Sequence, residues 1–435
     1  MSTLLRLATA GSVDDGKSTL VGRLLYDSKS VLSDQMDAVE RVSRDRGLEH
    51  ADLALLTDGL RAEREQGITI DVADRYFATP RRSFILADCP GHVQYTRNTV
   101  TGASTADVVV LLVDARKGLL EQTRRHLAVA SLLRVPYVIV AINKIDLVDF
   151  DEQVFARLSA EVVAAATDLG LADVRTIPVS ALAGDNVVHR SRRTPWYDGP
   201  SLLELLEEIP AAADPATEVF RLPVQVVLRP QAAARDPRLR DYRGYAGQIA
   251  AGVVTVGDRV VALPSGRTST VEGIDTADGG LKQAFAPQSV TLRLTDDIDI
   301  ARGDLIAAVG DAPAPTQDLL ATICWLSDRV LLPGSRVLVK HTTRTVQAVV
   351  RDVVGRLDLD SATIGPAESL GLNDIGQVSL RLAAPIAAEE YVVSRRTGAF
   401  LLIDPHDGAT LAAGMVGEPL AEARCPGQRP AQYVI

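Results

Sequence analysis

The sequence is poor in the patterns that bind zinc or form disulfide frameworks. Its three cysteines, Cys89, Cys324 and Cys425, lie far apart and form no C-x-x-C pair. Six histidines are scattered along the chain without an H-E-x-x-H pattern. This cysteine usage is typical of a reducing cytoplasm and offers no common zinc site. We therefore expect a cytoplasmic protein.

Long hydrophobic runs are also missing. No apolar stretch approaches the length that crosses a bilayer, so we expect no membrane partner. The first ten residues, "MSTLLRLATA", are too short for a signal peptide and continue directly into a glycine-containing loop.

Basic residues are fewer than acidic ones: the sequence has 46 Lys and Arg and 56 Asp and Glu, which gives a formal net charge of -10. That balance argues against a general nucleic-acid coat protein, and we expect no nucleic-acid partner. Apolar residues make up 46% of 435 residues, which supplies core material for two to four domains.

The loop after the first apolar run reads "GSVDDGKST" and fits the pattern G-x-x-x-x-G-K-[ST]. A strand, a glycine loop and a helix in this order direct several backbone N–H groups and the positive end of the helix at one phosphate. Lys17 can reach the β- and γ-phosphates, and the Ser18 hydroxyl can bind Mg²⁺. The predicted phosphate-binding residues of this loop are Gly11, Ser12, Val13, Asp14, Asp15, Gly16, Lys17, Ser18 and Thr19.

The first 212 residues alternate between strand-like and helix-like segments. The runs "LLRLATA", "SFILAD", "DVVVLLVDA" and "PYVIVAINK" suit strands that are mostly buried on both faces, with helices expected at 121–134, at 152–169 before Gly170, and in "GPSLLELLEEIP" before Pro210. Such alternation predicts an α/β domain over 1–212, with a mostly parallel sheet and helices on both faces.

After "AAADPATE" the helix-like patterns end, and the sequence predicts short strands separated by Gly, Pro and Asp. The stretches "RLPVQVVL", "YAGQIAAGVV", "DRVVALPSG", "SVTLRLT" and "DLIAAVG" predict an antiparallel β-barrel over 217–311. Beyond the Pro-rich "GDAPAPTQD", the stretches "LLATICWL", "SRVLVKHTT", "TVQAVVRDVVGRL", "GQVSLRLAA" and "AFLLID" predict a second barrel over 316–435.

Two further motifs of the first domain suit the phosphate end of a nucleotide. "DCPGH", residues 88–92, follows a strand; Asp88 can support Mg²⁺ through water, and the Gly91 amide can meet a γ-phosphate. "REQGITI" places Thr69 in a polar loop, where it can bind Mg²⁺ only when a γ-phosphate orders that loop.

Two others suit the base. "NKID" contains Asn143, Lys144 and Asp146, and the Asp146 carboxylate can accept hydrogen bonds from N1–H and the 2-amino group of guanine, which adenine lacks. "SAL", residues Ser180, Ala181 and Leu182, can place a backbone N–H on guanine O6. Because ligands bind at the carboxyl ends of parallel strands, these motifs together predict a GTP site.

This order of motifs, followed by two barrels, resembles the translation-factor class of GTPases, of which elongation factor Tu is the best-known member. The resemblance implies that Ser18 and Thr69 bind Mg²⁺ directly, with Asp88 acting through water, and that His92 orients the hydrolytic water. It also implies catalytic support from Lys17 and Thr69, and a guanine pocket made by Asn143, Lys144, Asp146, Ser180, Ala181 and Leu182.

Within this class the longer stretches "GSVDDGKSTLVGRLLYDSK", "GHVQYTRNTVTGASTADVVVLLVDARKGLLEQTRRH" and "RGYAGQIAAGVVTVGDRVVALPSGRTSTV" resemble the GTPase subunit of bacterial sulfate adenylyltransferase. That family implies a separate catalytic subunit, in a heterodimer or higher hetero-oligomer, that joins sulfate to ATP to give adenosine 5′-phosphosulfate and diphosphate. GTP hydrolysis by the present chain would drive that unfavourable reaction.

Alternatives remain at this point. One is a translation factor that carries aminoacyl-tRNA. Another is a scaffold that binds a nucleotide without hydrolysing it, but the presence of Thr69 and His92 argues against this second alternative. The Arg-rich loop at 229–244 reads either as a partner contact or, more simply, as a solvated insertion.

Overall fold

The computed structural model describes residues 3–29, 33–45, 51, 53–56, 72–92, 95–210, 214–231, 240–418 and 420. Its contacts group the chain into two compact units that divide near residue 212. Thr69 and the rest of "GITI" lie outside the described residues. None of the described helices is long and apolar enough to cross a membrane.

The first unit is built on a six-stranded sheet in the order β2-β3-β1-β4-β5-β6. All neighbouring strands are parallel except β2, which runs antiparallel to β3 at the edge. The strands are β1 (Thr3–Gly11), β2 (Ala73–Ala78), β3 (Arg82–Asp88), β4 (Val108–Asp114), β5 (Tyr137–Asn143) and β6 (Val174–Pro178). Every residue of β4 is buried, as its unbroken apolar run predicts.

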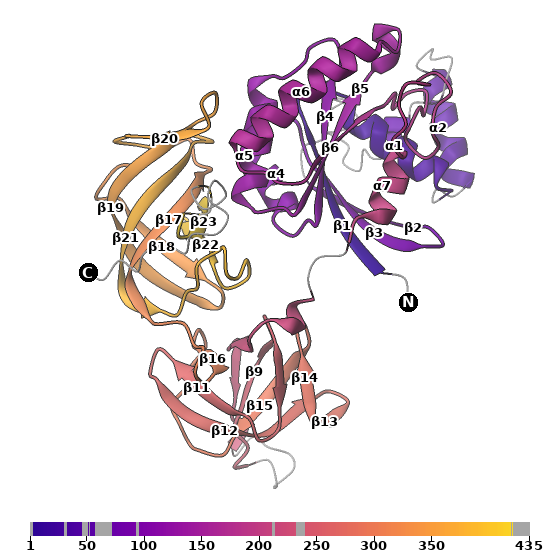
Figure 1. Ribbon diagram of the computed structural model, residues 1–435. Helices are drawn as coiled ribbons and strands as arrows, with labels where there is room; N and C mark the ends of the chain where they lie inside the picture. Colours follow the sequence, from indigo (N-terminus) through magenta and orange to yellow (C-terminus); the bar gives the residue numbers. More distant parts are fainter. Residues whose placement is uncertain are drawn as a thin grey trace. The chain divides into compact units, whose positions relative to one another are not determined.

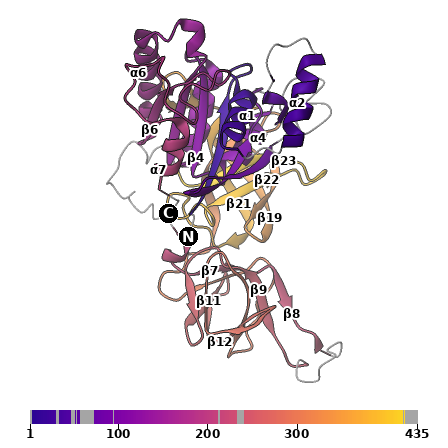
Figure 2. The same ribbon diagram turned by 90° about the vertical axis from the view of Figure 1, so that its right-hand side faces the viewer.

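Helices cover both faces of this sheet, as Figures 1 and 2 show. On one face, leucines of α1 and α7 pack with β1, β3 and β4 in one apolar core. On the other face lie α4, α5 and α6. The helical segments are α1 (Lys17–Asp27), α2 (Ser33–Asp45), η1 (Leu53–Leu56), α4 (Thr96–Ala103), α5 (Glu121–Leu132), η3 (Ile145–Val148), α6 (Glu152–Asp168) and α7 (Leu202–Glu208).

Local chemistry explains where these helices begin and end. Asp151 caps α6 by accepting a hydrogen bond from the Gln153 N–H at 2.7 Å, and Gly170 follows the helix with a φ of 80°. Ser201 and Glu204 form a capping box at the start of α7. The helices expected at 152–169 and before Pro210 are thereby confirmed.

The second unit contains two antiparallel β-structures. The first has the strand order β7-β16-β11-β12-β15-β9-β8, with β13 beside β12 and a separate ribbon of β10 and β14. Its strands are β7 (Arg221–Pro223), β8 (Val226–Leu228), β9 (Gly244–Gln248), β10 (Val253–Thr255), β11 (Arg259–Leu263), β12 (Arg267–Thr276), β13 (Gly279–Leu281), β14 (Gln283–Phe285), β15 (Ser289–Leu294) and β16 (Leu305–Ala308).

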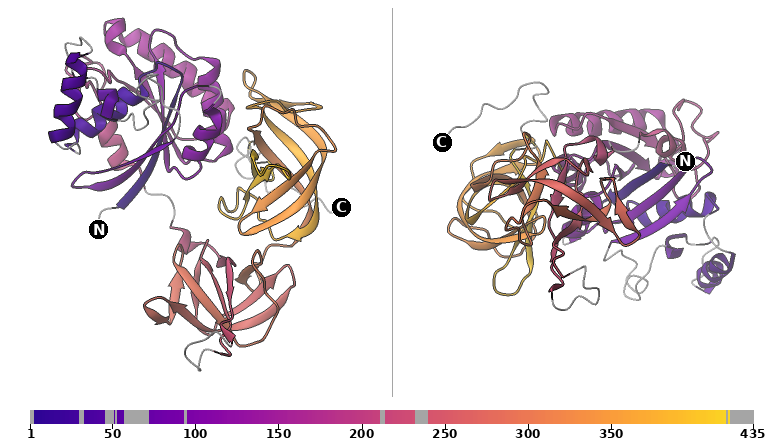
Figure 3. Two further views of the ribbon diagram at one scale, coloured as in Figure 1. Left: turned by 180° about the vertical axis from the view of Figure 1, so that it is seen from behind. Right: turned by 90° about the horizontal axis from the view of Figure 1, so that it is seen from below.

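The second β-structure is a closed barrel. Its strand order is β18-β22-β23-β17-β21-β19-β20, and an additional pairing of β18 with β19 closes the ring. Figure 3 shows these strands from behind. They are β17 (Thr316–Trp325), β18 (Arg336–His341), β19 (Arg344–Asp358), β20 (Thr363–Gly365), β21 (Ile375–Ile386), β22 (Ala399–Ile403) and β23 (Thr410–Val416). The predicted fold class, an α/β GTPase-type domain followed by antiparallel barrels, is confirmed.

Two predicted strands differ in detail. "RLPVQVVL" forms two strands, because the chain pairs first with β16 through β7 and then with β9 through β8. "YAGQIAAGVV" likewise divides into β9, which pairs with β15, and β10, which pairs with β14. In each case the chain turns where it changes its pairing partner.

Candidate nucleotide site

The motifs of the first unit meet at one edge of its sheet. Gly11 ends β1, Asp88 ends β3, Asn143 ends β5 and Pro178 ends β6. The register confirms their alignment: Thr9 lies opposite Asp88, and Asp114 lies opposite Asn143. Because these strands are parallel, the loops that follow them lie at the carboxyl edge, where α/β sheets bind ligands.

The phosphate loop turns back on itself between β1 and α1. Asp14 and Gly16 both adopt left-handed backbone angles, with φ of 64° and 94°. Gly16 is the N-cap of α1, and a Cβ at this position would lie 2.5 Å from Asn143 Nδ2. Only glycine combines this conformation with this approach, so the loop opens the N-terminus of α1 to a ligand.

Lys17 is buried at the base of the loop. Its ammonium group donates to the carbonyls of Gly11 at 2.9 Å and Ser12 at 2.8 Å. Burial lowers the pKa of Lys17, although the charges of Asp15 and Asp88 oppose the shift. An ammonium group has three donors, so one remains for a phosphate oxygen.

Asp15 supports the loop from inside rather than facing a phosphate. Its Oδ2 accepts a hydrogen bond from the Ser12 N–H at 2.7 Å, and burial raises the pKa of this carboxyl. Within the described chain, Asp15 Oδ1 and Ser12 Oγ are buried without a hydrogen-bond partner. A carboxylate repels phosphate, so the Asp15 side chain shapes the loop and leaves phosphate binding to backbone N–H groups and Lys17. Val13, Ser18 and Thr19 are partly exposed on the same loop and first helical turn.

The "DCPGH" loop lies directly against the phosphate loop. The Thr9 hydroxyl donates to Asp88 Oδ1 at 2.8 Å, which fixes this buried carboxylate. A Cβ on Gly91 would lie 2.2 Å from Lys17 Nζ and 2.7 Å from the Gly11 carbonyl. Glycine is therefore required at position 91 for the two loops to meet.

His92 follows on this loop and is partly exposed. Its ring meets that of Tyr95 edge-on, with 6.0 Å between the ring centroids. The sequence analysis did not single out Tyr95, since an aromatic residue directly before a helix carries no signal by itself.

Asn143 ties the predicted base loops to the phosphate loop. Its Nδ2 donates to the Asp15 carbonyl at 2.7 Å, and its Oδ1 accepts the Ala181 N–H at 2.9 Å. The side chain thus spans two segments far from it in the sequence. Its first role in this geometry is to position loops, and a direct contact with guanine stays a prediction.

Lys144 is held by a carboxylate that the sequence analysis missed. Lys144 has a left-handed φ of 61°, donates to the Asp14 carbonyl, and lies 3.0 Å from Asp114 Oδ2. Burial alone would raise the pKa of Asp114, but hydrogen bonds from Arg116 and Lys144 outweigh it and hold the pKa below its usual range. The ionised Asp114 therefore anchors Lys144 across the phosphate loop.

Asp146 lies in η3, two residues after Lys144, and is partly exposed. No hydrogen bond between described residues uses its carboxylate. In "SAL", Ser180 is fully buried and its Oγ accepts the Ala183 N–H at 3.3 Å, whereas Leu182 is exposed. These positions leave the Asp146 carboxylate and the backbone of the "SAL" loop as the groups available to a base.

The oxygen donors expected for Mg²⁺ are hard ligands of the type this ion prefers. Ser18 lies in the first turn of α1 and Asp88 at the end of β3, on adjoining loops. The described residues contain no group of three or more His, Cys, Asp or Glu that could hold a metal alone. This donor set fits an ion held jointly by the protein and nucleotide phosphates.

Comparisons with known proteins agree with this geometry. Residues 2–214 match the family model described as the elongation factor Tu GTP binding domain, and residues 318–417 match the GTP-eEF1A C-terminal domain-like model. The chain is 48% identical over 426 residues to sulfate adenylyltransferase subunit 1 of Cellvibrio japonicus, covering 97% of this chain and 89% of that protein. The chain belongs to the sulfate adenylyltransferase subunit 1 family.

Other members and neighbours are similar as well. The bifunctional enzyme CysN/CysC of Mycobacterium tuberculosis is 54% identical over 418 residues, which cover 96% of this chain and 67% of that protein. A solved structure of sup35 complexed with GDP covers 96% of this chain and 94% of that one, with 24% identity and a TM-score of 0.42. The two relatives named above confirm the family inferred from the sequence motifs. The translation-factor alternative is reduced to a relation of fold, which the matched GTP-binding domain model accounts for.

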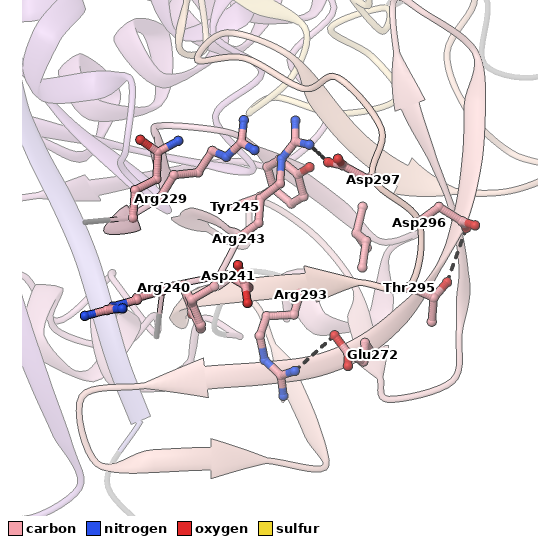
Figure 4. Close-up of a pocket in the computed structure, with 13 residues that line it drawn as sticks. Arg229, Arg240, Asp241, Arg243, Tyr245, Glu272, Arg293, Thr295, Asp296 and Asp297 are labelled. Atoms are coloured by element: carbon pink, nitrogen blue, oxygen red, sulfur yellow. Dashed lines mark hydrogen bonds and ion pairs between the residues drawn. The ribbon is translucent and has the colours of Figure 1, made fainter. Parts of the chain in front are cut away.

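A separate cavity of about 640 Å³ lies in the first β-structure of the second unit, and Arg229, Arg240 and Arg243 of the Arg-rich segment form part of its lining. Figure 4 shows Arg243 paired with Asp297 and Arg293 paired with Glu272. The lining contains four arginines and four carboxylates, so its charges largely compensate one another. Residues 232–239 of this segment lie outside the described residues, so both interpretations of the segment stay predictions, and we assign the cavity no ligand.

A buried histidine behind the phosphate loop gives a pH prediction. His126 of α5 is 2% exposed, and its Nδ1 has no partner in the described chain. Burial, together with the charge of Lys17, lowers the pKa of His126 to about 3. In the unfolded chain an ordinary histidine binds a proton below about pH 6.5. The stability that neutral His126 contributes is therefore complete above about pH 6.5 and is lost as the pH falls toward 3.

Lowering the pH from 7 to 5 should reduce the unfolding free energy of wild type by about 2 kcal/mol more than that of His126→Gln. This follows from about 1.4 kcal/mol for each pH unit below the pKa of the unfolded histidine. Urea unfolding of both proteins at the two pH values measures the difference. His341 is also buried with a lowered pKa, but it is present in both proteins and cancels. A pH-independent difference would show that folding leaves the pKa of His126 unchanged, and the prediction would be wrong.

Proposed function

We propose that this chain hydrolyses GTP, and that hydrolysis drives sulfate activation by a separate catalytic subunit of sulfate adenylyltransferase. The observation that carries the proposal is the joining of phosphate and base loops by Asn143, in a chain whose relatives are named subunits of that enzyme. The reaction on the partner would convert ATP and sulfate to adenosine 5′-phosphosulfate and diphosphate. Nothing in the proposal requires a membrane or a nucleic acid, and the cytoplasm is its expected location.

The roles proposed for the residues follow from their positions. The N-terminus of α1 and the third donor of Lys17 bind phosphate oxygens, and the Gly91 amide faces the γ-phosphate. Asp146 accepts from N1–H and the 2-amino group of guanine, while the "SAL" backbone donates to O6. His92, exposed beside the phosphate loop, orients the attacking water. Ser18 would bind Mg²⁺ directly and Asp88 through water, and Thr69 would be a further direct ligand, as the sequence resemblance implies. The ion, when bound, neutralises charge on the β- and γ-phosphates.

The proposed domains are 1–212 for GTP hydrolysis and 217–311 and 316–435 for the two barrels, which contribute surface for the partner. Such a chain has no sulfate site of its own, so coupling must pass through the complex. A bound nucleotide shifts an equilibrium only by its differential affinity for two states. GTP binding alone can accelerate sulfate activation, but only hydrolysis linked to adenylyl transfer can move its end point.

This gives a direct test with the purified complex. The chain alone should form no adenosine 5′-phosphosulfate from ATP and sulfate. With the catalytic subunit and GTP, product should accumulate beyond the ATP–sulfate equilibrium, and with a non-hydrolysable GTP analogue it should stop at that equilibrium. Product formed is measured against GTP consumed.

His92→Ala serves as the matched variant in this assay. If a variant that binds but does not hydrolyse GTP still drove product past equilibrium, the coupling proposal would be wrong. GTP hydrolysis would then not be the energy source. If wild type with GTP also stopped at the equilibrium, the nucleotide would act only as an allosteric activator. Retention of tRNA by the purified chain, without a sulfate-activating partner, would instead favour a role in translation.

A further inference from the structure

Arg23 lies on α1, six residues after Lys17, and connects this helix to the "SAL" loop. Its Nε donates to the Ala181 carbonyl at 3.2 Å, and its Nη2 donates to the Leu182 carbonyl. Its Nη1 lies 3.6 Å from Asp27 Oδ1 on the same helix. One guanidinium group therefore donates hydrogen bonds to two consecutive carbonyls of a loop about 160 residues away in the sequence.

The loop is fitted closely around this contact. A Cβ on Gly184, which has a φ of 86°, would lie 3.3 Å from Asp27 Oδ2 and 3.4 Å from Arg23 Cδ. The arginine side chain is only 20% exposed. Its rigid planar fork matches two neighbouring acceptors, which the single ammonium group of lysine cannot reproduce.

The hydrogen bonds of the loop single out one backbone group. Ala181 N–H donates to Asn143, Ala183 N–H to Ser180 Oγ, and Gly184 N–H to the Ser180 carbonyl. Among the hydrogen bonds of the described chain, none uses the Leu182 N–H. It is therefore the donor of this loop that is left for a ligand.

Peptide geometry links that donor to Arg23. The Ala181 carbonyl and the Leu182 N–H belong to one planar trans peptide unit, so they point in opposite directions. Because Arg23 holds the Ala181 carbonyl toward α1, the Leu182 N–H is directed away from α1. The next carbonyl, of Leu182, is held by the same guanidinium, which restricts rotation of the unit from its other side.

We propose that Arg23 is a positioning residue for base recognition: it orients the Leu182 N–H toward an acceptor at the 6-position of a purine. This inference rests on the proposed function, since it concerns the same GTP site. Arg23 itself touches no nucleotide. It makes the 6-oxo group of guanine a second determinant of specificity, independent of the 2-amino group read by Asp146.

Two analogues separate the two determinants. In 6-thio-GTP a weak sulfur acceptor replaces O6, whereas in ITP the 2-amino group is absent and O6 is retained. For Arg23→Gln and Arg23→Lys we expect GTP affinity to fall about ten-fold, and the preference for GTP over 6-thio-GTP to shrink by a similar factor, as for a lost hydrogen bond. The preference for GTP over ITP should stay at the wild-type value.

Fluorescent-nucleotide displacement by each analogue measures these ratios. Arg157→Gln is the matched control, because Arg157 lies on α6 in the same unit, on an exposed helix face, where its partner among the described residues is Glu161 at 3.0 Å. The control should match wild type for all three nucleotides. The lysine variant keeps the charge and length of the side chain, so it provides the measurement if the glutamine variant fails to fold.

Two results would overturn the inference. An unchanged preference for GTP over 6-thio-GTP in both Arg23 variants would show that Arg23 does not set base recognition. An equal loss for all three nucleotides would reduce Arg23 to a structural residue. Failure of wild type itself to prefer GTP would instead overturn the proposed function, so the two failures are distinguishable.

Discussion

Asp146→Asn should reverse the base preference from GTP to xanthosine triphosphate. The Asp146 carboxylate is partly exposed in η3 and accepts no hydrogen bond from another described residue, so both of its oxygens are available. An asparagine would present a donor to the 2-amino group of guanine, but it would match the 2-oxo group of xanthine. Sites built around such hydrogen bonds reject the mismatched base by orders of magnitude, and we expect a change in the ratio of affinities of at least about 10³-fold.

Competition binding of both nucleotides to both proteins measures this ratio. Asp149→Asn is a suitable control, because Asp149 lies three residues further on, is exposed, and has a left-handed φ of 54°, which asparagine tolerates. That variant should retain the parental preference. If Asp146→Asn bound GTP as tightly as the parent, the assignment of Asp146 to guanine would be abandoned.

His92→Ala should separate hydrolysis from binding. The His92 imidazole is partly exposed beside the phosphate loop, and its ring contact in the described chain is the edge-on packing with Tyr95. A group that positions water contributes mainly to the transition state. We therefore expect GTP affinity within a few-fold of wild type and single-turnover hydrolysis slower by about 10²-fold or more.

Two further variants define this result. Lys17→Ala should lose GTP affinity, because it removes a buried charge-assisted contact to phosphate. His189→Ala should behave as wild type, since His189 is exposed on a different loop. Parental rates and affinities in both His92→Ala and Lys17→Ala would place the hydrolytic site elsewhere.

The sequence predicts best the elements whose burial is uniform. The apolar run of β4 indicates a strand covered on both faces, and it is buried throughout. In contrast, β12 was missed because "RTSTVEGIDT" alternates polar and small residues on a half-exposed barrel surface. β23 was missed for a related reason, since its Ala and Gly residues lack the bulk that marks a strand.

The residues of the candidate site likewise fall into those that the sequence predicts and those that it does not. Motifs at strand ends are local, so Lys17, Asp88 and Asn143 could be placed at one edge of the sheet before the structure was known. Long-range partners could not. Asn143 reaches residues 128 and 38 positions away, and an arginine within an amphipathic helix, such as Arg23, has the same local pattern as a solvent-exposed one.

Because the Asn143 side chain joins the phosphate loop to the "SAL" loop, GTP can be treated as a bivalent ligand of this site. In the proposed function the triphosphate and the guanine bind to separate loops, and the Asn143 amide joins those two loops. Binding of either end then presents the other loop at a high effective concentration, so the linked molecule gains affinity beyond its two halves. A substitution at Asn143 should weaken GTP by lowering that effective concentration, even where every group that touches the base or the phosphates is intact.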